Sequence, residues 1–283
     1  MGKAIDYVRL MRPLNCSMMG VAVLVGAALA SPPDLATRLL NLGYGFITGF
    51  TLTAASMVIN DYYDKEIDAV NAPNRPIPRG AIEPDEAIAF AFILTAIGFA
   101  TSYLTNLFSL AIAIVAWAVF VVYTTVGKRT GLPGNFLVST CVTVPFIYGS
   151  AVTVNSLESN VLFFAAMAFF SNTGREITKG IVDVEGDELQ NVRTLAVRYG
   201  EKNAATAAAA FYLLAVMLSP APWLLNLVSF WFIPFVAVTD FGLLASSFLL
   251  RKDYSKDNAR KIKNLVLLWF FFGLLAFVAG TFR

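Results

Sequence analysis

Apolar stretches long enough to cross a membrane follow one another along nearly the whole chain of 283 residues. A bilayer core is about 30 Å thick, so a spanning helix needs roughly 20 predominantly apolar residues. The composition agrees, because 57% of the residues are hydrophobic and only 14% are charged, against about 25% charged residues in a soluble domain. The sequence therefore predicts an all-α, polytopic membrane protein with nine transmembrane helices. These are expected near residues 13–30, 39–60, 86–104, 107–124, 134–153, 160–175, 203–220, 226–250 and 262–281.

The basic residues indicate how these helices are oriented. With nine spans, 19 of the 21 Lys and Arg residues fall on the face that carries the N-terminus, and only Arg38 and Arg283 fall on the other. Cytoplasmic loops carry an excess of Lys and Arg. We therefore expect a multi-pass protein of the cytoplasmic membrane, with its N-terminus and long loops inside and its C-terminus outside. The basic run 251–263 is expected to anchor the inner face at anionic lipid headgroups.

The composition also limits the chemistry. The chain has no histidine, which excludes imidazole as a general base or metal ligand. Its two cysteines, Cys16 and Cys141, lie in apolar stretches and are expected to be small buried side chains. Any bound metal must therefore be held by oxygen atoms, which favours Mg²⁺ or Mn²⁺ over zinc. A net charge of +2 gives no reason to expect nucleic acid as a partner.

Acidic residues concentrate in two long loops of the predicted inner face, at about 61–85 and 176–202, which hold 12 of the 19 Asp and Glu residues. Where the first loop begins, Asn60, Asp64 and Asp68 are spaced by four, so on a helix their side chains share one face. Like charges at this spacing repel each other. A divalent cation reverses the sign of that interaction, because Mg²⁺ binds carboxylate, water and phosphate oxygens.

The second loop repeats this spacing with Asp183 and Asp187. Basic residues accompany both clusters, namely Arg75, Arg79, Lys128, Arg129, Lys179 and Arg193. Carboxylates that bind a metal beside Lys and Arg that bind phosphate oxygens are typical of a diphosphate site. The simpler alternative is that these residues are solvated loop charges. Two such clusters on one predicted face, each flanked by cations, favour the site.

The sequence around these residues resembles that of a known family. The run NDYYDKEID from Asn60 to Asp68, followed by NRPIPRG, is similar to the first signature of the UbiA superfamily of membrane prenyltransferases. The run REITKGIVDVEGD from Arg175 to Asp187, followed by RTLAVRYG, is similar to the second. The blocks RPLN and YTTVGKR resemble two further family blocks, so the resemblance covers nearly the whole chain.

This resemblance implies one domain over residues 1–283, a helical bundle around a central cavity that the two acidic loops cap on the cytoplasmic side. It also implies an enzyme that binds an isoprenyl diphosphate through two Mg²⁺, with Mn²⁺ as an alternative. Asn60, Asp64 and Asp68 would hold one ion, and Asp183 and Asp187 the other, with the four aspartates catalytic. The implied substrate-binding residues are Asn15, Asn60, Arg75, Tyr123, Lys128, Lys179 and Arg193.

The acceptor is less constrained than the donor. The sequence of the motifs is most similar to that of archaeal members. This similarity implies geranylgeranyl transfer from geranylgeranyl diphosphate to the free glycerol hydroxyl of geranylgeranylglyceryl phosphate. This reaction forms the second ether bond of archaeal membrane lipids. Such an acceptor carries its own phosphate, for which Arg79, Arg129, Arg175 and Arg198 are available. An aromatic quinone precursor or a tetrapyrrole is the alternative acceptor.

The alternative outside enzymology is a secondary transporter. Transporters place their coupling acids near the bilayer midplane, whereas here only Asp240 lies away from the ends of a predicted span. An acid inside a membrane is costly, so we expect Asp240 to face a cavity or to have a partner. The same span contains Pro234, which is expected to kink it.

Overall fold

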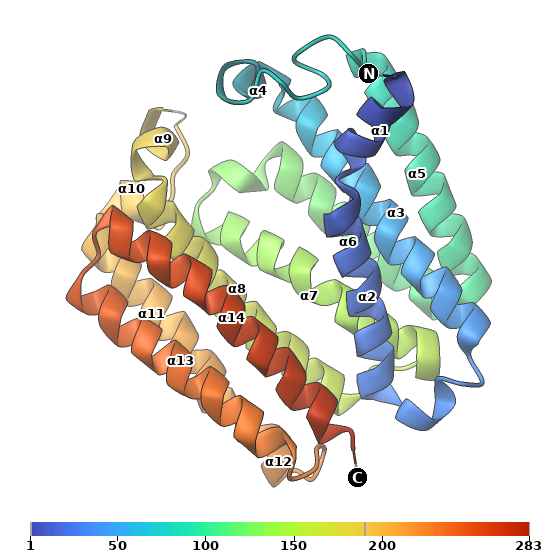
Figure 1. Ribbon diagram of the computed structural model, residues 1–283, viewed down its shortest axis with the longest axis vertical. Helices are drawn as coiled ribbons and strands as arrows, with labels where there is room; N and C mark the ends of the chain where they lie inside the picture. Colours follow the sequence, from blue (N-terminus) through green and yellow to red (C-terminus); the bar gives the residue numbers. More distant parts are fainter. Residues whose placement is uncertain (1, 190, 283) are drawn as a thin grey trace. The chain divides into compact units, whose positions relative to one another are not determined.

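The computed structural model describes residues 2–189 and 191–282, so Arg283 lies outside the described residues. The described chain consists of helices joined by turns and loops, and contains no β-strand (Figure 1). It divides into two compact units. Unit 1 comprises the chain up to Thr125 together with Pro145–Leu157, and unit 2 comprises Val126–Val144 and the chain from Glu158 onwards.

Unit 1 contains two helices outside the expected membrane spans and the first four spanning helices. Its elements are α1 (Lys3–Met11), α2 (Pro13–Ala30), η1 (Pro32–Asp34), α3 (Leu39–Tyr63), α4 (Lys65–Asn71), α5 (Pro84–Thr105), α6 (Leu107–Thr125) and the second half of α7 (Leu132–Val154). Helix α3 packs against both α2 and α5, and α6 packs against α5. Small residues of α3, such as Ala54 and Ala55, are fully buried in the core of this unit beside Leu10 and Ile82.

Two glycines allow α2 and the second half of α7 to approach very closely. A methyl group added to Gly149 would lie 2.2 Å from the carbonyl oxygen of Val23, and one added to Gly26 would lie 2.1 Å from that of Phe146. The backbones are therefore in direct contact, as small residues permit between membrane helices.

Unit 2 begins with η2 (Gly127–Arg129) and the first half of α7, and then contains the rest of the chain. Its other elements are α8 (Ser159–Val182), α9 (Val184–Leu189), α10 (Leu195–Tyr199), α11 (Glu201–Leu218), α12 (Ala221–Leu224), α13 (Phe232–Lys252) and α14 (Lys256–Gly280). Helices α8, α11, α13 and α14 pack against one another, and α13 and α14 run side by side in orange and red (Figure 1). Their shared core includes Tyr212, whose hydroxyl lies 2.9 Å from that of Thr178.

Eight helices of the described chain are long and apolar enough to cross a membrane. They correspond to the predicted spans except for the sixth, at 160–175. That position is occupied by α8, which has 24 residues but carries Arg175, Glu176 and Lys179 in its second half. Length and composition therefore do not identify α8 as a span, and the count of nine remains a prediction.

The helices differ from the predicted spans where polar sequence begins. Helices α3 and α8 continue to Tyr63 and Val182, beyond the predicted ends at 60 and 175, because backbone hydrogen bonding does not stop where the apolar run stops. The predicted kink at Pro234 is wrong. Helix α13 begins at Phe232, so Pro234 lies in its first turn, where proline is tolerated.

Asp240 has a hydrogen-bond partner, as expected for an acidic side chain inside a membrane-spanning helix. The hydroxyl of Ser219, just after α11, donates a hydrogen bond of 2.6 Å to Oδ2 of Asp240 on α13. Its other carboxylate oxygen is buried and has no hydrogen-bond partner among the described residues. Asp240 therefore links two helices of unit 2.

Candidate active site

The first acidic cluster lies where α3 ends and α4 begins. Asp64 is the residue between them, with φ −91° and ψ 3°, so the chain departs from helical geometry at this one position. The backbone N–H of Asp64 still donates to the carbonyl of Asn60 at 2.9 Å, and that of Asp68 to the carbonyl of Asp64 at 2.7 Å. The predicted spacing of four therefore persists across the junction. The amide of Asn60 donates to Oδ2 of Asp64 at 2.9 Å, which brings these two predicted ligands together.

Two arginines neutralise the buried acids of this cluster. Arg75 forms an ion pair with Asp68 and lies 3.4 Å from Asp61. Arg12 also contacts Oδ1 of Asp61, at 2.5 Å. Asp61 is 3% exposed, so it serves as the shared counter-ion of two arginines. Because its carboxylate is paired with these two arginines, we do not assign Asp61 to the metal.

Arg12 is a residue of this cluster to which the sequence analysis gave no role. It lies at the corner between α1 and α2 in the left-handed conformation, with φ 54° and ψ 67°, and Pro13 follows as the first residue of α2. The RPLN block indicated that a helix starts at Pro13, but it did not indicate which acid Arg12 contacts. A second pair, Arg79 with the buried Asp6, ties α1 to the loop after α4.

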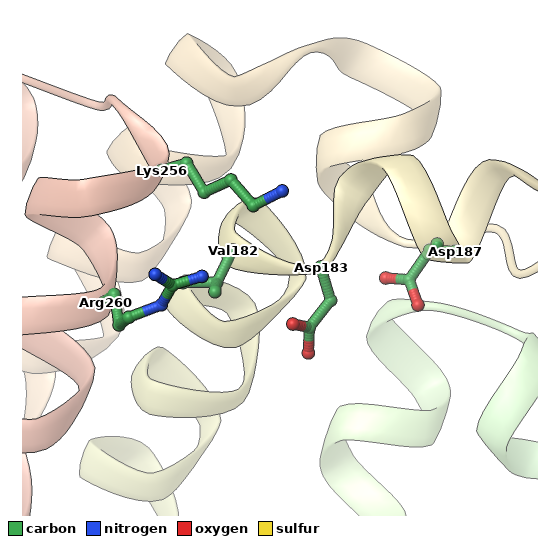
Figure 2. A pocket seen from close by; sticks show the side chains of 6 residues that line it. Val182, Asp183, Asp187, Lys256 and Arg260 are labelled. Carbon is green, nitrogen blue, oxygen red and sulfur yellow. The ribbon is translucent and has the colours of Figure 1, made fainter. Parts of the chain in front are cut away.

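The second acidic cluster has the same local design in unit 2. Asp183 is the residue between α8 and α9, with φ −102° and ψ 9°, and the backbone N–H of Asp187 donates to its carbonyl at 2.9 Å. Both side chains line a pocket of about 420 Å³ together with Val182 and Gly186 and with two cations from α14, Lys256 and Arg260. Figure 2 shows the two carboxylates on the α8–α9 side of this pocket and the two cations on the α14 side.

The acids of α9 have opposite electrostatic surroundings. The pKa of Asp187 is raised to about 6, chiefly by partial burial and also by the nearby Asp183 carboxylate, while Lys179 and a hydrogen bond from Thr194 oppose the shift. Glu185 is exposed, and its hydrogen bond from Lys256 lowers its pKa. A bound cation would favour the charged form of Asp187, because metal binding requires a deprotonated carboxylate.

A tight turn brings η2 beside the segment that follows α9. Gly131 has φ +76°, and a methyl group there would lie 2.1 Å from the carbonyl oxygen of Arg193. The backbone N–H of Arg193 also donates to the carbonyl of Arg129 at 3.1 Å. The structure thus brings together two segments that carry predicted diphosphate ligands, Lys128 on η2 and Arg193 before α10.

The remaining predicted substrate-binding residues lie further from these contacts. Asn15 is exposed in the first turn of α2, and within the described chain its side chain has no hydrogen bond to the first cluster. Tyr123 is half-buried near the end of α6. Lys179 is exposed in the last turn of α8, with Nζ 3.9 Å from Glu176. The acceptor candidate Arg175 is also paired with Glu176, at 2.9 Å.

The donor atoms fit a hard divalent cation that completes its shell with substrate. No group of three or more Asp, Glu, Cys or His side chains in the described chain is arranged to hold an ion alone. Each cluster instead offers a pair of carboxylates, and Mg²⁺ is typically bound by one or two carboxylates together with waters and phosphate oxygens. Asp183 and Asp187 also border a pocket with room for such a ligand.

Comparison with known proteins identifies similar sequences along almost the full length. A profile of the UbiA prenyltransferase family matches residues 19–279. A digeranylgeranylglyceryl phosphate synthase of Archaeoglobus fulgidus is 36% identical, over 94% of this chain and 91% of that protein. A digeranylgeranylglyceryl phosphate synthase of Methanosarcina mazei is 34% identical, over 97% of this chain and 98% of that protein.

Solved structures have the same fold. A structure of digeranylgeranylglyceryl phosphate synthase matches with a TM-score of 0.90 and 30% identity, over 99% of both chains. A UbiA homolog from Archaeoglobus fulgidus bound to GPP and Mg²⁺ matches with a TM-score of 0.71, over 96% of this chain and 99% of that one. At 18% identity, the second likeness concerns the fold alone.

Proposed function

The chain belongs to the UbiA prenyltransferase family and is an integral membrane enzyme, and we propose that it forms the second ether bond of archaeal membrane lipids. Its donor is geranylgeranyl diphosphate, and its acceptor is the free glycerol hydroxyl of geranylgeranylglyceryl phosphate. The observation that carries the proposal is the pair of acidic clusters, each at a helix junction and each beside cations. Full-length similarity to proteins named for this product supports the choice of acceptor.

In the reaction, the glycerol oxygen forms a bond to C1 of the geranylgeranyl group. The bond between C1 and the diphosphate oxygen breaks, its electron pair leaves with the diphosphate, and the hydroxyl proton is released. Negative charge therefore grows on the leaving group while positive charge grows on the allylic carbon. Groups fixed around the diphosphate accelerate this step most, because they interact more strongly with the transition state than with the substrate.

Different residues would bind the metal ions and the diphosphate. Asn60, Asp64 and Asp68 would hold one Mg²⁺, and Asp183 and Asp187 a second, with Mn²⁺ as a substitute. The bound ions would supply electrostatic stabilisation of the leaving diphosphate. Arg75, Lys128, Lys179 and Arg193 donate hydrogen bonds to diphosphate oxygens, and charge-assisted bonds of this kind are roughly twice as strong as neutral ones.

A product assay with purified protein tests the function. The full chain in detergent is given geranylgeranyl diphosphate, Mg²⁺ and a panel of acceptors, comprising geranylgeranylglyceryl phosphate, a hydroxybenzoate and a tetrapyrrole. We expect a digeranylgeranyl ether from the glyceryl phosphate and its loss on chelation of the metal. Product from an aromatic or tetrapyrrole acceptor, with none from the glyceryl phosphate, would overturn the assignment.

Two substitutions test the site itself. Asp64→Asn and Asp183→Asn each remove one negative charge from a cluster at nearly constant volume. Each is expected to reduce turnover by at least about 100-fold, as for groups that bind or orient a catalytic metal, while the melting temperature of the protein stays close to that of the wild type. Activity near the wild-type level in both variants would refute the two-ion assignment. Asp34→Asn, in the short helix η1, is the matched control and should leave turnover unchanged.

A further inference from the structure

Two cations of the basic run expected at the lipid surface also line a pocket. The pocket of about 420 Å³ is lined by Asp183 and Asp187 on one side and by Lys256 and Arg260 on the other (Figure 2). Its volume is within the range of small-molecule sites, roughly 300–1,000 Å³. Lys256 and Arg260 are spaced by four at the start of α14, so they share one face of that helix. The pocket and all of its lining residues lie within unit 2.

The rest of the basic run does not share this position. Arg251 and Lys252 end α13, and Lys261 lies on α14 next to Arg260; all three are exposed and none lines the pocket. The run therefore has two parts with different surroundings. One part suits an anionic membrane surface, and the other faces a concave site.

The two pocket cations retain capacity for an anion. Nζ of Lys256 lies 2.6 Å from Glu185, but the two side chains are 43% and 77% exposed, and a lysine has further donors to offer. Arg260 lies 3.8 Å from Asp257, too far for a hydrogen bond, so within the described chain its five donors are not committed. An exposed surface pair contributes little and is readily exchanged for a phosphate.

Two of the four arginines predicted from sequence for the acceptor phosphate, Arg79 and Arg175, are less available than Arg260 because each is paired with an acid. Arg79 is paired with the buried carboxylate of Asp6, and Arg175 is paired with Glu176 at 2.9 Å. Withdrawing either arginine from its acid would leave a buried or half-buried negative charge without its partner, which is costly. Arg260 is not paired with a buried acid in the described chain, so it can bind a phosphate without leaving a buried negative charge alone.

We infer that Lys256 and Arg260 bind the phosphate of the acceptor lipid, which makes this pocket the acceptor's headgroup subsite. The inference rests on the proposed function. A guanidinium matches two phosphate oxygens at once, an ammonium adds a compact charge, and the first turn of α14 presents the positive end of a 25-residue helix. The cations proposed for the donor diphosphate lie on other segments, namely after α4, on η2, at the end of α8 and before α10.

This arrangement also gives the acceptor its orientation. A phosphate held on the α14 side sets the glycerol next to Asp183 and Asp187, the residues proposed to hold the metal and diphosphate. The acceptor hydroxyl is then directed to the reacting carbon by an anchor that takes no part in bond breaking. Loss of the anchor should therefore weaken acceptor binding and leave donor binding intact.

The test separates acceptor from donor. Arg260→Ala and Lys256→Ala are each expected to raise KM for geranylgeranylglyceryl phosphate about tenfold or more, with KM for geranylgeranyl diphosphate changed less than about twofold. Arg260→Lys should show a smaller rise in the acceptor KM than Arg260→Ala, since lysine keeps the positive charge but lacks the planar, two-pronged guanidinium. Equilibrium binding of geranylgeranylglyceryl phosphate and of the phosphate-free alcohol, without donor or Mg²⁺, provides a second measurement. The wild type should prefer the phosphate, and Arg260→Ala should lose that preference.

Lys252→Ala and Lys261→Ala are the matched controls from the same basic run. If they raise the acceptor KM as much as Arg260→Ala does, the run acts through the anionic bilayer surface and the subsite is refuted. A rise in the donor KM with an unchanged acceptor KM would assign the two cations to the diphosphate and equally refute it. If the wild type makes no product from this acceptor, the proposed function fails. The binding measurement still decides the subsite, because equal binding of phosphate and alcohol by the wild type overturns it.

Discussion

Asp187 carries a charge that its surroundings in the metal-free protein disfavour. Its pKa is raised from 3.8 to about 6, first by burial and then by the neighbouring Asp183 carboxylate. A carboxyl group whose pKa is higher in the folded than in the unfolded state lowers the free energy of unfolding when ionised. This penalty is complete above the folded-state pKa and disappears as the pH falls below the unfolded-state pKa.

Asp187→Asn should therefore raise the melting temperature of the metal-free protein at about pH 7.5 and have little effect at about pH 4. The same variant should lose prenyl transfer, so stability and activity change in opposite directions. Glu185→Gln is the control two residues away, where the hydrogen bond from Lys256 lowers the pKa and no stabilisation is expected. A lower melting temperature for Asp187→Asn at the higher pH would contradict this account.

In the ion pairs of Asp61, the acid is buried and the two arginines are partly exposed to solvent. The side chain of Asp61 is 4% exposed, whereas those of Arg12 and Arg75 are 32% and 36% exposed. Removing an arginine leaves a buried carboxylate without its counter-ion, whereas removing the acid leaves arginines that water can solvate. The acid and its cations are thus not equivalent in stability.

Arg12→Ala is accordingly expected to lower the free energy of unfolding by about 1–3 kcal/mol, less than the roughly 3–5 kcal/mol of a fully buried pair, because Arg12 is partly solvated. Asp61→Asn, which keeps a polar partner for Arg12, should cost less. Denaturant unfolding in detergent, followed by circular dichroism, measures both. Equal losses, or a larger loss for Asp61→Asn, would show that the burial asymmetry does not govern the pair.

Among the elements, the contact between α2 and α7 depends on glycine at defined positions. Gly149 on α7 lies against the backbone of α2, and Gly26 on α2 lies against the backbone of α7. An added methyl group meets a carbonyl oxygen, which cannot move aside as a flexible side chain could. The two helices would have to separate along this contact.

Gly149→Ala should therefore destabilise the protein by about 1–3 kcal/mol, the usual cost of overpacking. Gly43, on the membrane helix α3, is the control because nothing lies within 4 Å of the added methyl group. Gly43→Ala should be neutral or should stabilise by about 0.5–1 kcal/mol through helix propensity. Thermal unfolding of both variants in one detergent tests the contrast, and similar melting temperatures for the two would refute it.

Apolar length predicted most membrane helices well, because burial in a bilayer leaves a long, uniform signal. The predicted span 13–30 coincides with α2, and the span 107–124 differs from α6 by one residue. The short helices α4 and α9 were not predicted, since six or seven residues with few apolar positions are too short to show a helical period. The span at 226–250 began too early because the turn before Phe232 is itself apolar.

The candidate site was predictable where its residues are neighbours in sequence. The spacing of Asp183 and Asp187 was sufficient to expect them together, and they line one pocket. Lys256 was assigned to the lipid surface because nothing in the order of residues indicates which face of α14 meets α9. Arg12 was overlooked as a partner of Asp61 for the same reason, since 49 residues separate the two.

For the whole molecule, the direction of the chain across the membrane depends on α8. If α8 crosses the bilayer with the eight helices identified by length and composition, the N- and C-termini lie on opposite faces. We expect this result, with the N-terminus in the cytoplasm, from the distribution of Lys and Arg. Reporter enzymes fused to each terminus, one active only outside and one only inside the cell, measure it. Both termini on one face would mean that α8 does not cross.

The ion pair between Arg75 and Asp68 has a consequence for the order of events at the first cluster. In the resting protein, a cation proposed to receive the diphosphate occupies a carboxylate proposed to receive the metal. Metal alone must compete with the arginine, and diphosphate alone must compete with the aspartate. Arriving together, they give each side chain a new partner of opposite charge, so the lipid donor and its ion should load as a single unit and leave as one.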